Sequence, residues 1–348
     1  MKALIKDLCC SSIVSGCERI NQNDAVIDYL NNHNVLFEQD VLGNIIFKKT
    51  GKGEKTLMLV AHYDEIGFSV KYIDDNGYIY FSAIGGIDTS ILRGQRVVII
   101  HNGNLIDGVI GAKPVHMINN ARNGNNNKGI DISDLWIDIG VTEKKDDIRE
   151  LVSVGDPISF PPNFNELKND IFSSKSIDNR VGVAALFLLF EELQNTTVNY
   201  KNIYFVLSSQ EELGLRGARV ASFTLNPDIC IAIDVTHATD YPTINKNKFG
   251  DVRLKQGAVI PTGSNFTPTL QKCLRDIAKK SEIPYQIESL PGHSGTDISE
   301  VQIIRGGCAS GLISIPCRYM HTPIETASYN DIRSVVDILF DFCRIGQN

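Results

Sequence analysis

The spacing of apolar residues separates the two ends of the chain from its middle. Near the N-terminus, residues 2–12 and 24–32 show the 3.6-residue period of amphipathic helices. Residues 56–61 form a continuous apolar run, which is typical of a strand buried on both faces. After residue 170, strand and helix patterns alternate, as in proteins built around a parallel sheet. We therefore predict an α/β fold, a three-layer α/β/α sandwich with a mainly parallel sheet.

The alternation after residue 170 predicts three buried strands and three helices. The strands are expected over residues 203–207, 229–233 and 311–315, and the helices over residues 181–194, 267–280 and 329–344.

The middle of the chain shows only short strand patterns separated by turn signals. Asp74-Asp75-Asn76-Gly77 and Asn102-Gly103-Asn104 each lie between two apolar runs, which is a hairpin signal. We predict that residues 66–169 form a small β-rich, barrel-like domain, inserted into a larger domain made of residues 1–65 and 170–348. Residues 119–128 are rich in Asn and Gly and predict a solvated loop.

Composition limits the partners of the chain. Its 348 residues are enough for two domains, and the net charge of −7 argues against nucleic acid or an anionic membrane as a partner. The longest apolar run, residues 181–190, is too short to span a bilayer, and Lys2, Lys6 and Asp7 interrupt any signal sequence. The eight Cys include no CxxC pair, so we expect reduced thiols in a cytoplasmic protein.

Histidine and carboxylate side chains follow the apolar runs at the points where the strands should end. They are His62, Asp64, Glu211, Glu212, Asp234 and His321. Asp178 lies at the start of the helix predicted over residues 181–194. Ligands of open α/β sheets gather at the carboxyl ends of the strands, so these side chains should meet at one rim. Each has an ordinary structural explanation when taken alone, such as a helix cap or a solvated face, but their joint placement favours a site.

The adjacent acids Glu211 and Glu212 indicate what such a site binds. Two neighbouring carboxylates are costly at the mouth of a buried strand, because like charges repel and burial penalises both. A nearby cation removes that cost. Imidazole and carboxylate ligands suit zinc, cobalt or manganese.

Six stretches of the sequence resemble the tetrahedral aminopeptidases and glutamyl aminopeptidases, a family of dinuclear-metal exopeptidases formerly called cellulase M. The stretches are Ala61-His62-Tyr63-Asp64-Glu65-Ile66-Gly67-Phe68, Ile177-Asp178-Asn179-Arg180-Val181-Gly182, Gln210-Glu211-Glu212-Leu213-Gly214-Leu215-Arg216-Gly217-Ala218, Ala232-Ile233-Asp234-Val235-Thr236-His237, Gly295-Thr296-Asp297, and Ile315-Pro316-Cys317-Arg318-Tyr319-Met320-His321-Thr322-Pro323. Their order and approximate spacing match the family over nearly the whole chain.

The resemblance implies a role for each candidate residue. His62 and Asp234 would bind one metal ion, Glu212 and His321 a second, and Asp178 would bridge the two. Glu211 would be the general base for a hydroxide shared by the metals, and Asp64 would orient His62. The cofactors implied are two divalent ions per subunit, zinc or cobalt, with manganese as an alternative. The family also suggests a cis peptide bond between Asp178 and Asn179.

The resemblance further implies an aminopeptidase that removes N-terminal residues from short peptides. It also implies a homo-oligomer, commonly a dodecamer built from dimers through the inserted domain. A related amidohydrolase such as a deacylase remains an alternative, and a glucanase or a non-catalytic scaffold fits the residues less well. His237 could line the cleft or form a structural hydrogen bond, and Asp297 could lie near the substrate or cap a helix.

Overall fold

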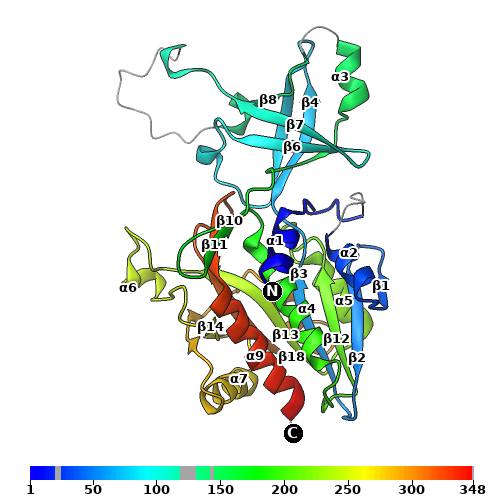
Figure 1. The fold of residues 1–348 in the computed structure, drawn as a ribbon, viewed down its shortest axis with the longest axis vertical. Coiled ribbons are helices and arrows are strands. Elements are labelled where there is room, and N and C mark those ends of the chain that lie inside the picture. Colours follow the sequence, from blue (N-terminus) through cyan, green and yellow to red (C-terminus); the bar gives the residue numbers. More distant parts are fainter. Residues whose placement is uncertain (20–24, 118–130, 142–144, 347–348) are drawn as a thin grey trace.

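The computed structural model describes residues 1–19, 25–117, 131–141 and 145–346, arranged as a layered α/β part and a smaller β part above it (Figure 1). The predicted loop over residues 119–128 lies outside the described residues. Among those that are described, no helix combines the length and the apolar character needed to cross a bilayer.

The larger part is built on an eight-stranded sheet with the order β1-β2-β12-β3-β13-β18-β14-β16. Its four central strands are parallel. The bounds of all eight are β1 Phe37–Gln39, β2 Ile45–Thr50, β12 Asn202–Ser208, β3 Thr56–His62, β13 Ile229–His237, β18 Ala309–Cys317, β14 Ala258–Val259 and β16 Tyr285–Gln286. β2 runs antiparallel to β12, and β14 runs antiparallel to β18. The predicted mainly parallel sheet is therefore confirmed, with antiparallel strands added towards both edges.

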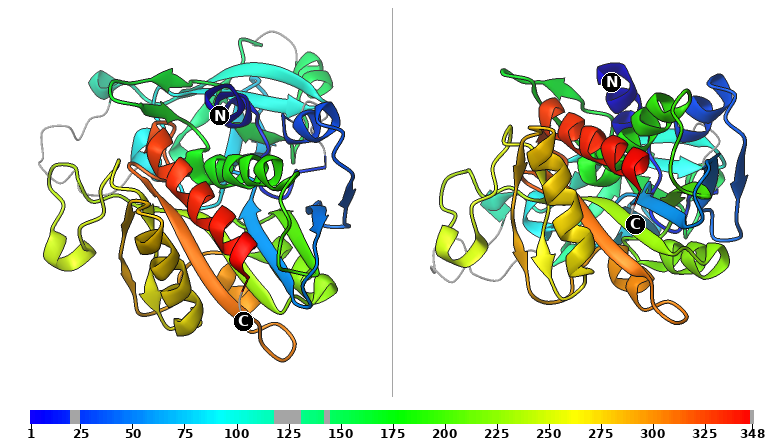
Figure 2. Two further views of the ribbon diagram at one scale, coloured as in Figure 1. Left: turned by 60° about the horizontal axis from the view of Figure 1, so that its bottom comes forward. Right: turned by 90° about the horizontal axis from the view of Figure 1, so that it is seen from below.

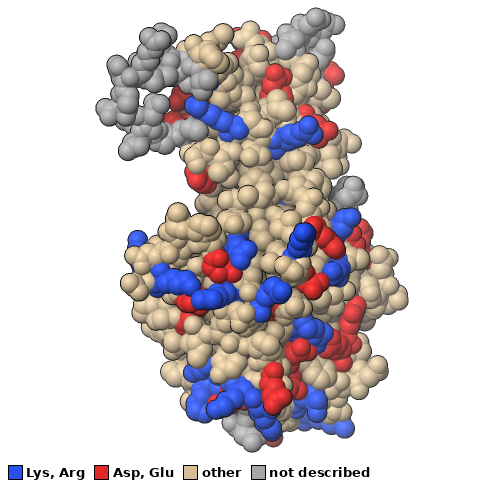
Figure 3. Space-filling view, turned by 60° about the vertical axis from the view of Figure 1, so that its left-hand side comes forward, with Lys and Arg blue, Asp and Glu red and all other residues tan. Residues whose placement is uncertain are grey.

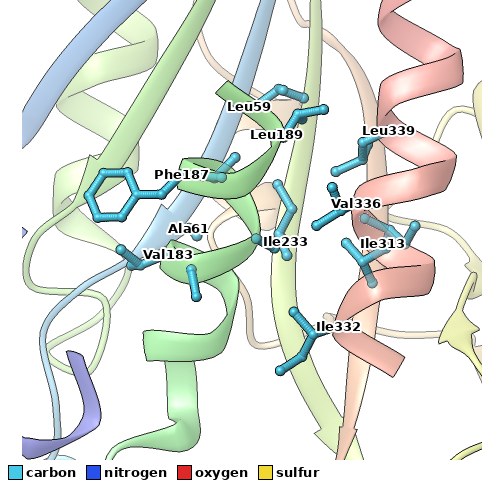
Figure 4. Packing of buried hydrophobic residues seen from close by; sticks show 14 of the residues in the cluster. Leu59, Ala61, Val183, Phe187, Leu189, Ile233, Ile313, Ile332, Val336 and Leu339 are labelled. Atoms are coloured by element: carbon cyan, nitrogen blue, oxygen red, sulfur yellow. The ribbon is translucent and has the colours of Figure 1, made fainter. Parts of the chain in front are cut away.

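Helices cover both faces of this sheet. The helices are α1 Lys2–Cys10, α2 Ala25–Asn32, α4 Ile177–Leu193, α5 Arg216–Leu225, α6 Lys246–Phe249, α7 Pro268–Lys280, α8 Ile298–Gln302 and α9 Tyr329–Ile345. α4 and α9 lie side by side on one face (Figure 2), where Val183, Phe187 and Val336 pack against Leu59 and Ile233 of the sheet (Figure 4). α5 and α8 contact the strands from the other face. The predicted three-layer sandwich is confirmed.

Alternate residues of the central strands belong to different cores. In β3, Leu57 and Leu59 join the core beneath α4 and α9, whereas Met58 and Val60 join the core beneath α5 and α8. Successive side chains of a strand point to opposite faces, and here both faces are covered. This explains why the run is apolar without interruption.

The smaller part is a closed six-stranded barrel with the order β4-β5-β8-β7-β6-β9. The strands are β4 Gly67–Ile73, β5 Ile79–Ile84, β6 Arg96–His101, β7 Asn104–Gly111, β8 Trp136–Asp138 and β9 Pro157–Ser159. Both predicted hairpins are present, as the antiparallel pairs β4–β5 and β6–β7. Phe68, Ile99 and Ile137 lie in a core that belongs to the barrel alone. The helix α3, Lys145–Leu151, also lies in this part (Figure 1).

Smaller sheets complete the structure. β10 Asn165–Glu166, β11 Ile171–Ser174 and β19 Glu325–Ser328 form one, and β15 Thr262–Gly263 and β17 Ser289–Leu290 form another. Basic and acidic side chains are interspersed on the face shown in Figure 3, which also shows a waist below the barrel.

Gly217 lets α5 begin directly against the end of β12. A Cβ at this position would lie 2.2 Å from the Ser209 backbone oxygen and 2.3 Å from Asn44 Oδ1. Both neighbours are fully buried and hydrogen-bonded to each other, so neither can move away freely. The helix and the strand end therefore need a residue without a side chain here.

We predict that Gly217→Ala lowers the free energy of unfolding by about 1–3 kcal/mol, the usual cost of forcing extra atoms into a packed site. Gly306→Ala is the matched control, because a Cβ there meets no atom within 4 Å. Urea denaturation of both variants measures the difference. Equal midpoints for the two variants would contradict the close approach at Gly217.

Candidate metal centre

Two of the candidate ligands leave the sheet on the same face. His62 ends β3 and Asp234 lies near the end of β13. Each continues the alternate positions, Met58 and Val60 in one strand and Cys230 and Ala232 in the other, that face α5 and α8. Because neighbouring parallel strands end at the same rim, the two side chains meet, with His62 Nε2 3.7 Å from Asp234 Oδ1.

Asp178 lies between two groups of ligands. Its Oδ1 is 3.0 Å from His62 Nε2, and its Oδ2 is 3.4 Å from His321 Nε2. His321 Nε2 is also 3.4 Å from Glu212 Oε1. The structure thus forms two clusters, His62–Asp178–Asp234 and Asp178–Glu212–His321, in each of which the ligand atoms lie within 4.8 Å of one another. Asp178 follows the residue that begins α4, and its peptide bond to Asn179 is cis, as the family resemblance suggested.

The charges of the site do not balance without a cation. Burial raises the pKa of Glu211, Glu212 and Asp234, and the mutual repulsion of the acids adds to the effect. Burial alone would lower the pKa of His321, but hydrogen bonds to Asp178 and Glu212 raise it to about 11. Four acids and two imidazoles meet at this rim, and bound metal ions would offset the excess of negative charge.

The donor atoms fit divalent metal ions. Each cluster offers one imidazole nitrogen and two carboxylates, with Asp178 common to both. This set of nitrogen and oxygen donors suits zinc, cobalt or manganese.

Asp64 belongs to neither cluster but contacts both. Its two carboxylate oxygens accept the backbone N–H groups of Glu211 and Glu212, each at 3.1 Å. His62 Nδ1 also faces Asp64, 3.2 Å from its backbone oxygen and 3.6 Å from Oδ1. Asp64 thus fixes the backbone of the acidic pair and lies behind the histidine ring.

Two residues that the sequence did not single out complete this support. The Ser209 N–H donates to Asn44 Oδ1 at 2.9 Å, and the Gln210 N–H donates to Glu18 Oε1 at 2.8 Å. Four consecutive backbone N–H groups, those of residues 209–212, therefore donate to side chains instead of to a helix or a strand. Three side chains, Asn44, Glu18 and Asp64, set the conformation of the segment that carries Glu211.

Glu325 also holds the backbone of candidate ligands, and the sequence analysis did not predict it. It is 2% exposed. Its carboxylate accepts the Asp178 N–H at 2.9 Å and the His321 N–H at 2.7 Å. Burial raises the pKa of Glu325, and the charge of Asp178 adds to this. The only signal of Glu325 in the sequence is an acid four residues after His321.

The loop between the barrel strands β5 and β6 also reaches the site. The backbone oxygen of Gly86, just after β5, lies 2.7 Å from His321 Nδ1. A Cβ on Gly86 would lie 3.2 Å from the same nitrogen. Backbone carbonyls commonly orient metal-binding histidines in this way.

Asp297 and His237, for which the sequence left a structural role open, lie close to the site without joining either cluster. Asp297 is buried, its Oδ2 accepts a hydrogen bond from Ser208, and it makes no side-chain capping bond to α8. Burial raises the pKa of Asp297 to about 6. Burial lowers the pKa of His237, and the charge of Asp178 acts against this.

Comparison with known proteins identifies the family. The family model of M42 glutamyl aminopeptidases matches residues 43–338. The lysyl aminopeptidase of Pyrococcus furiosus is 34% identical over 96% of this chain and 94% of its own. The glutamyl aminopeptidase of Lactococcus lactis is 32% identical over 82% of this chain and 79% of its own.

A solved structure agrees with the sequence comparisons. The TET1 peptidase of Pyrococcus horikoshii, which can assemble into a tetrahedron or a large octahedral shell, superposes with a TM-score of 0.85 at 29% identity, covering 99% of both chains. The match extends over the sandwich, the barrel and every element that carries a candidate ligand. The chain belongs to the M42 family of glutamyl aminopeptidases and is a peptidase that acts at the N-terminus of its substrates.

Proposed function

We propose that this aminopeptidase binds two divalent metal ions, one at His62, Asp178 and Asp234 and one at Asp178, Glu212 and His321. The observation that carries the proposal is the position of Asp178, whose two oxygens face the two clusters separately. Zinc or cobalt fits the donors best, and manganese is the alternative.

Two metal ions in these clusters would act as Lewis acids that polarise the scissile carbonyl and make water a better nucleophile. Glu211 is the one acid of the pair that belongs to neither cluster, and its Oε2 lies 3.9 Å from His62 Nε2. We assign it the role of general base: it accepts a proton from the attacking water and donates it to the leaving amine. Its raised pKa suits a group that must both accept and release a proton.

We assign Asp64, Glu18 and Asn44 to positioning. Their acceptors hold the backbone of residues 209–212, so the Glu211 carboxylate enters the site from a fixed main chain. Asp64 also faces the ring nitrogen of His62 that points away from the cluster, where a carboxylate fixes the tautomer of a metal ligand.

We propose that residues 66–169 form one domain, which contains the barrel, and that residues 1–65 and 170–348 form the catalytic domain. We propose that the barrel joins subunits into a homo-oligomer, a dodecamer built from dimers. The assembly of the Pyrococcus horikoshii relative supports this. Large apolar side chains on the outside of the barrel also support it, since Tyr72, Leu105 and Val109 are all about half exposed or more. A closed particle would restrict the substrates to short peptides.

We also place the enzyme in the cytoplasm. None of the eight cysteines is paired in a disulfide, which supports a reducing compartment. The names of the two relatives specify N-terminal residues of opposite charge, so membership of the family leaves the preferred residue open.

The assignment of Glu211 predicts that Glu211→Gln lowers kcat by about 100-fold or more while two metal ions remain bound. The amide keeps the size of the side chain but cannot accept the proton. Steady-state hydrolysis of aminoacyl coumarin amides and elemental analysis of the same samples measure both quantities. A metal-loaded variant with kcat within a few-fold of the wild type would remove Glu211 from this role.

The positioning role predicts that Glu18→Ala lowers kcat by about tenfold at full metal occupancy and leaves KM within about twofold, because a small misplacement of a catalytic group costs rate. Glu18→Gln keeps an acceptor for the Gln210 N–H and should restore most of kcat.

Asp331→Ala is the matched control for this experiment. Asp331 is a buried carboxylate that accepts the N–H groups of Lys255 and Gly257, both at 2.7 Å, and it contacts no residue of either cluster. The Asp331→Ala substitution should lower the melting temperature without lowering kcat. Parallel losses of kcat in both alanine variants would show that Glu18 acts only through stability.

If the chain forms the proposed dodecamer, multi-angle light scattering at micromolar concentration should give the mass of about twelve subunits. Leu105→Asp and Val109→Asp together should shift the distribution to smaller species, because they replace two exposed apolar side chains of β7 with charged ones. A wild-type protein that elutes with the mass of one chain would contradict the proposed assembly.

A further inference from the structure

One carboxylate near the metal centre has no part in the chemistry described above. Glu288 Oε2 accepts a hydrogen bond of 2.8 Å from Thr236 Oγ1. Thr236 lies two residues beyond Asp234 in β13, so it leaves the sheet on the same face as that ligand. Glu288 therefore lies on the side of the sheet from which His62 and Asp234 enter the site.

The backbone of Glu288 is held firmly in this place. Its backbone oxygen accepts the N–H of Thr262 at 2.8 Å, and the next two residues pair with Thr262 and Gly263 as strand β17. Leu290, in that strand, packs against the core beneath α5 and α8. The carboxylate thus projects from an ordered segment on the same side of the sheet as His62 and Asp234.

Glu288 carries a charge that nothing described neutralises. Its residue is half-buried, burial raises its pKa, and the hydrogen bond from Thr236 lowers it in part. In the described parts of the chain no Lys, Arg or His forms an ion pair with Glu288. Other half-buried acids have such partners: Asp240 pairs with Arg318 at 2.6 Å, and Glu300 faces Arg219 at 3.5 Å.

We propose that Glu288 binds the cationic side chain of the substrate's N-terminal residue and gives the enzyme a preference for peptides that begin with lysine or arginine. This inference rests on the proposed function, because it takes the peptide N-terminus to be held at the two metal clusters. It assigns the substrate class that membership of the family leaves open.

The spacing along β13 supports the assignment. Two residues of a strand correspond to about 7 Å, so Thr236 and the carboxylate bonded to it begin roughly one side-chain length beyond Asp234. Lysine carries its ammonium on a flexible four-carbon stem, which spans a comparable length from its Cα. A short polar side chain would leave the carboxylate without a partner, and an acidic one would be repelled by it.

The test compares N-terminal residues that match in length but differ in charge. The coumarin amides of lysine, norleucine and glutamate are hydrolysed by the metal-loaded wild type, by Glu288→Gln and by Glu300→Gln. Glu288→Gln keeps an acceptor for Thr236 and removes only the charge. Glu300→Gln is the matched control, because it removes a half-buried carboxylate that faces Arg219 instead.

We expect the wild type and Glu300→Gln to favour lysine over norleucine in kcat/KM by about tenfold or more, and Glu288→Gln to lose about tenfold of that ratio with little change for norleucine. Glu288→Lys should favour glutamate over lysine. An unchanged lysine-to-norleucine ratio in Glu288→Gln would overturn the inference and leave the peptidase intact. Failure of the metal-loaded wild type to hydrolyse any of the three amides would overturn the proposed function, and the inference with it.

Discussion

The repulsion among buried carboxylates is the constraint on which the rest of this structure depends. Asp178, Glu211, Glu212 and Asp234 gather at the carboxyl edge of the sheet, where each is less than a tenth exposed in its side chain. Such a group is stable only if positive charge is brought into it. Asp178 shares its two oxygens between two histidines, and the proposal of two cation positions rests on this sharing.

The fold meets this constraint by fixing main chain as well as side chains. The backbone N–H groups of residues 209–212 donate hydrogen bonds to the side chains of Asn44, Glu18 and Asp64. The Glu325 carboxylate likewise accepts the backbone N–H groups of Asp178 and His321. Each of these acceptors is buried, so loss of one would leave a backbone N–H unsatisfied at a cost of about 1–3 kcal/mol. Rigid support of this kind suits the role of general base proposed for Glu211, because such a carboxylate must stay within reach of one water.

The sequence predicted the parts of this arrangement that follow from local pattern. Residues 56–61 are apolar because both faces of β3 are covered, and the position of His62 at the end of that run follows from the same pattern. The hairpins of the barrel followed from their turn residues. Glu18, Asn44 and Glu325 were not predicted, because each acts through a contact to backbone that only the folded chain brings near. Glu18 meets Gln210 across 192 residues, and no spacing rule connects them.

The direct test of the two cation positions is anomalous diffraction from crystals of the zinc-loaded enzyme. We expect two peaks in each chain, one beside His62 and Asp234 and one beside Glu212 and His321, both within coordination distance of the Asp178 carboxylate. A single peak, or two peaks that do not share Asp178, would contradict it.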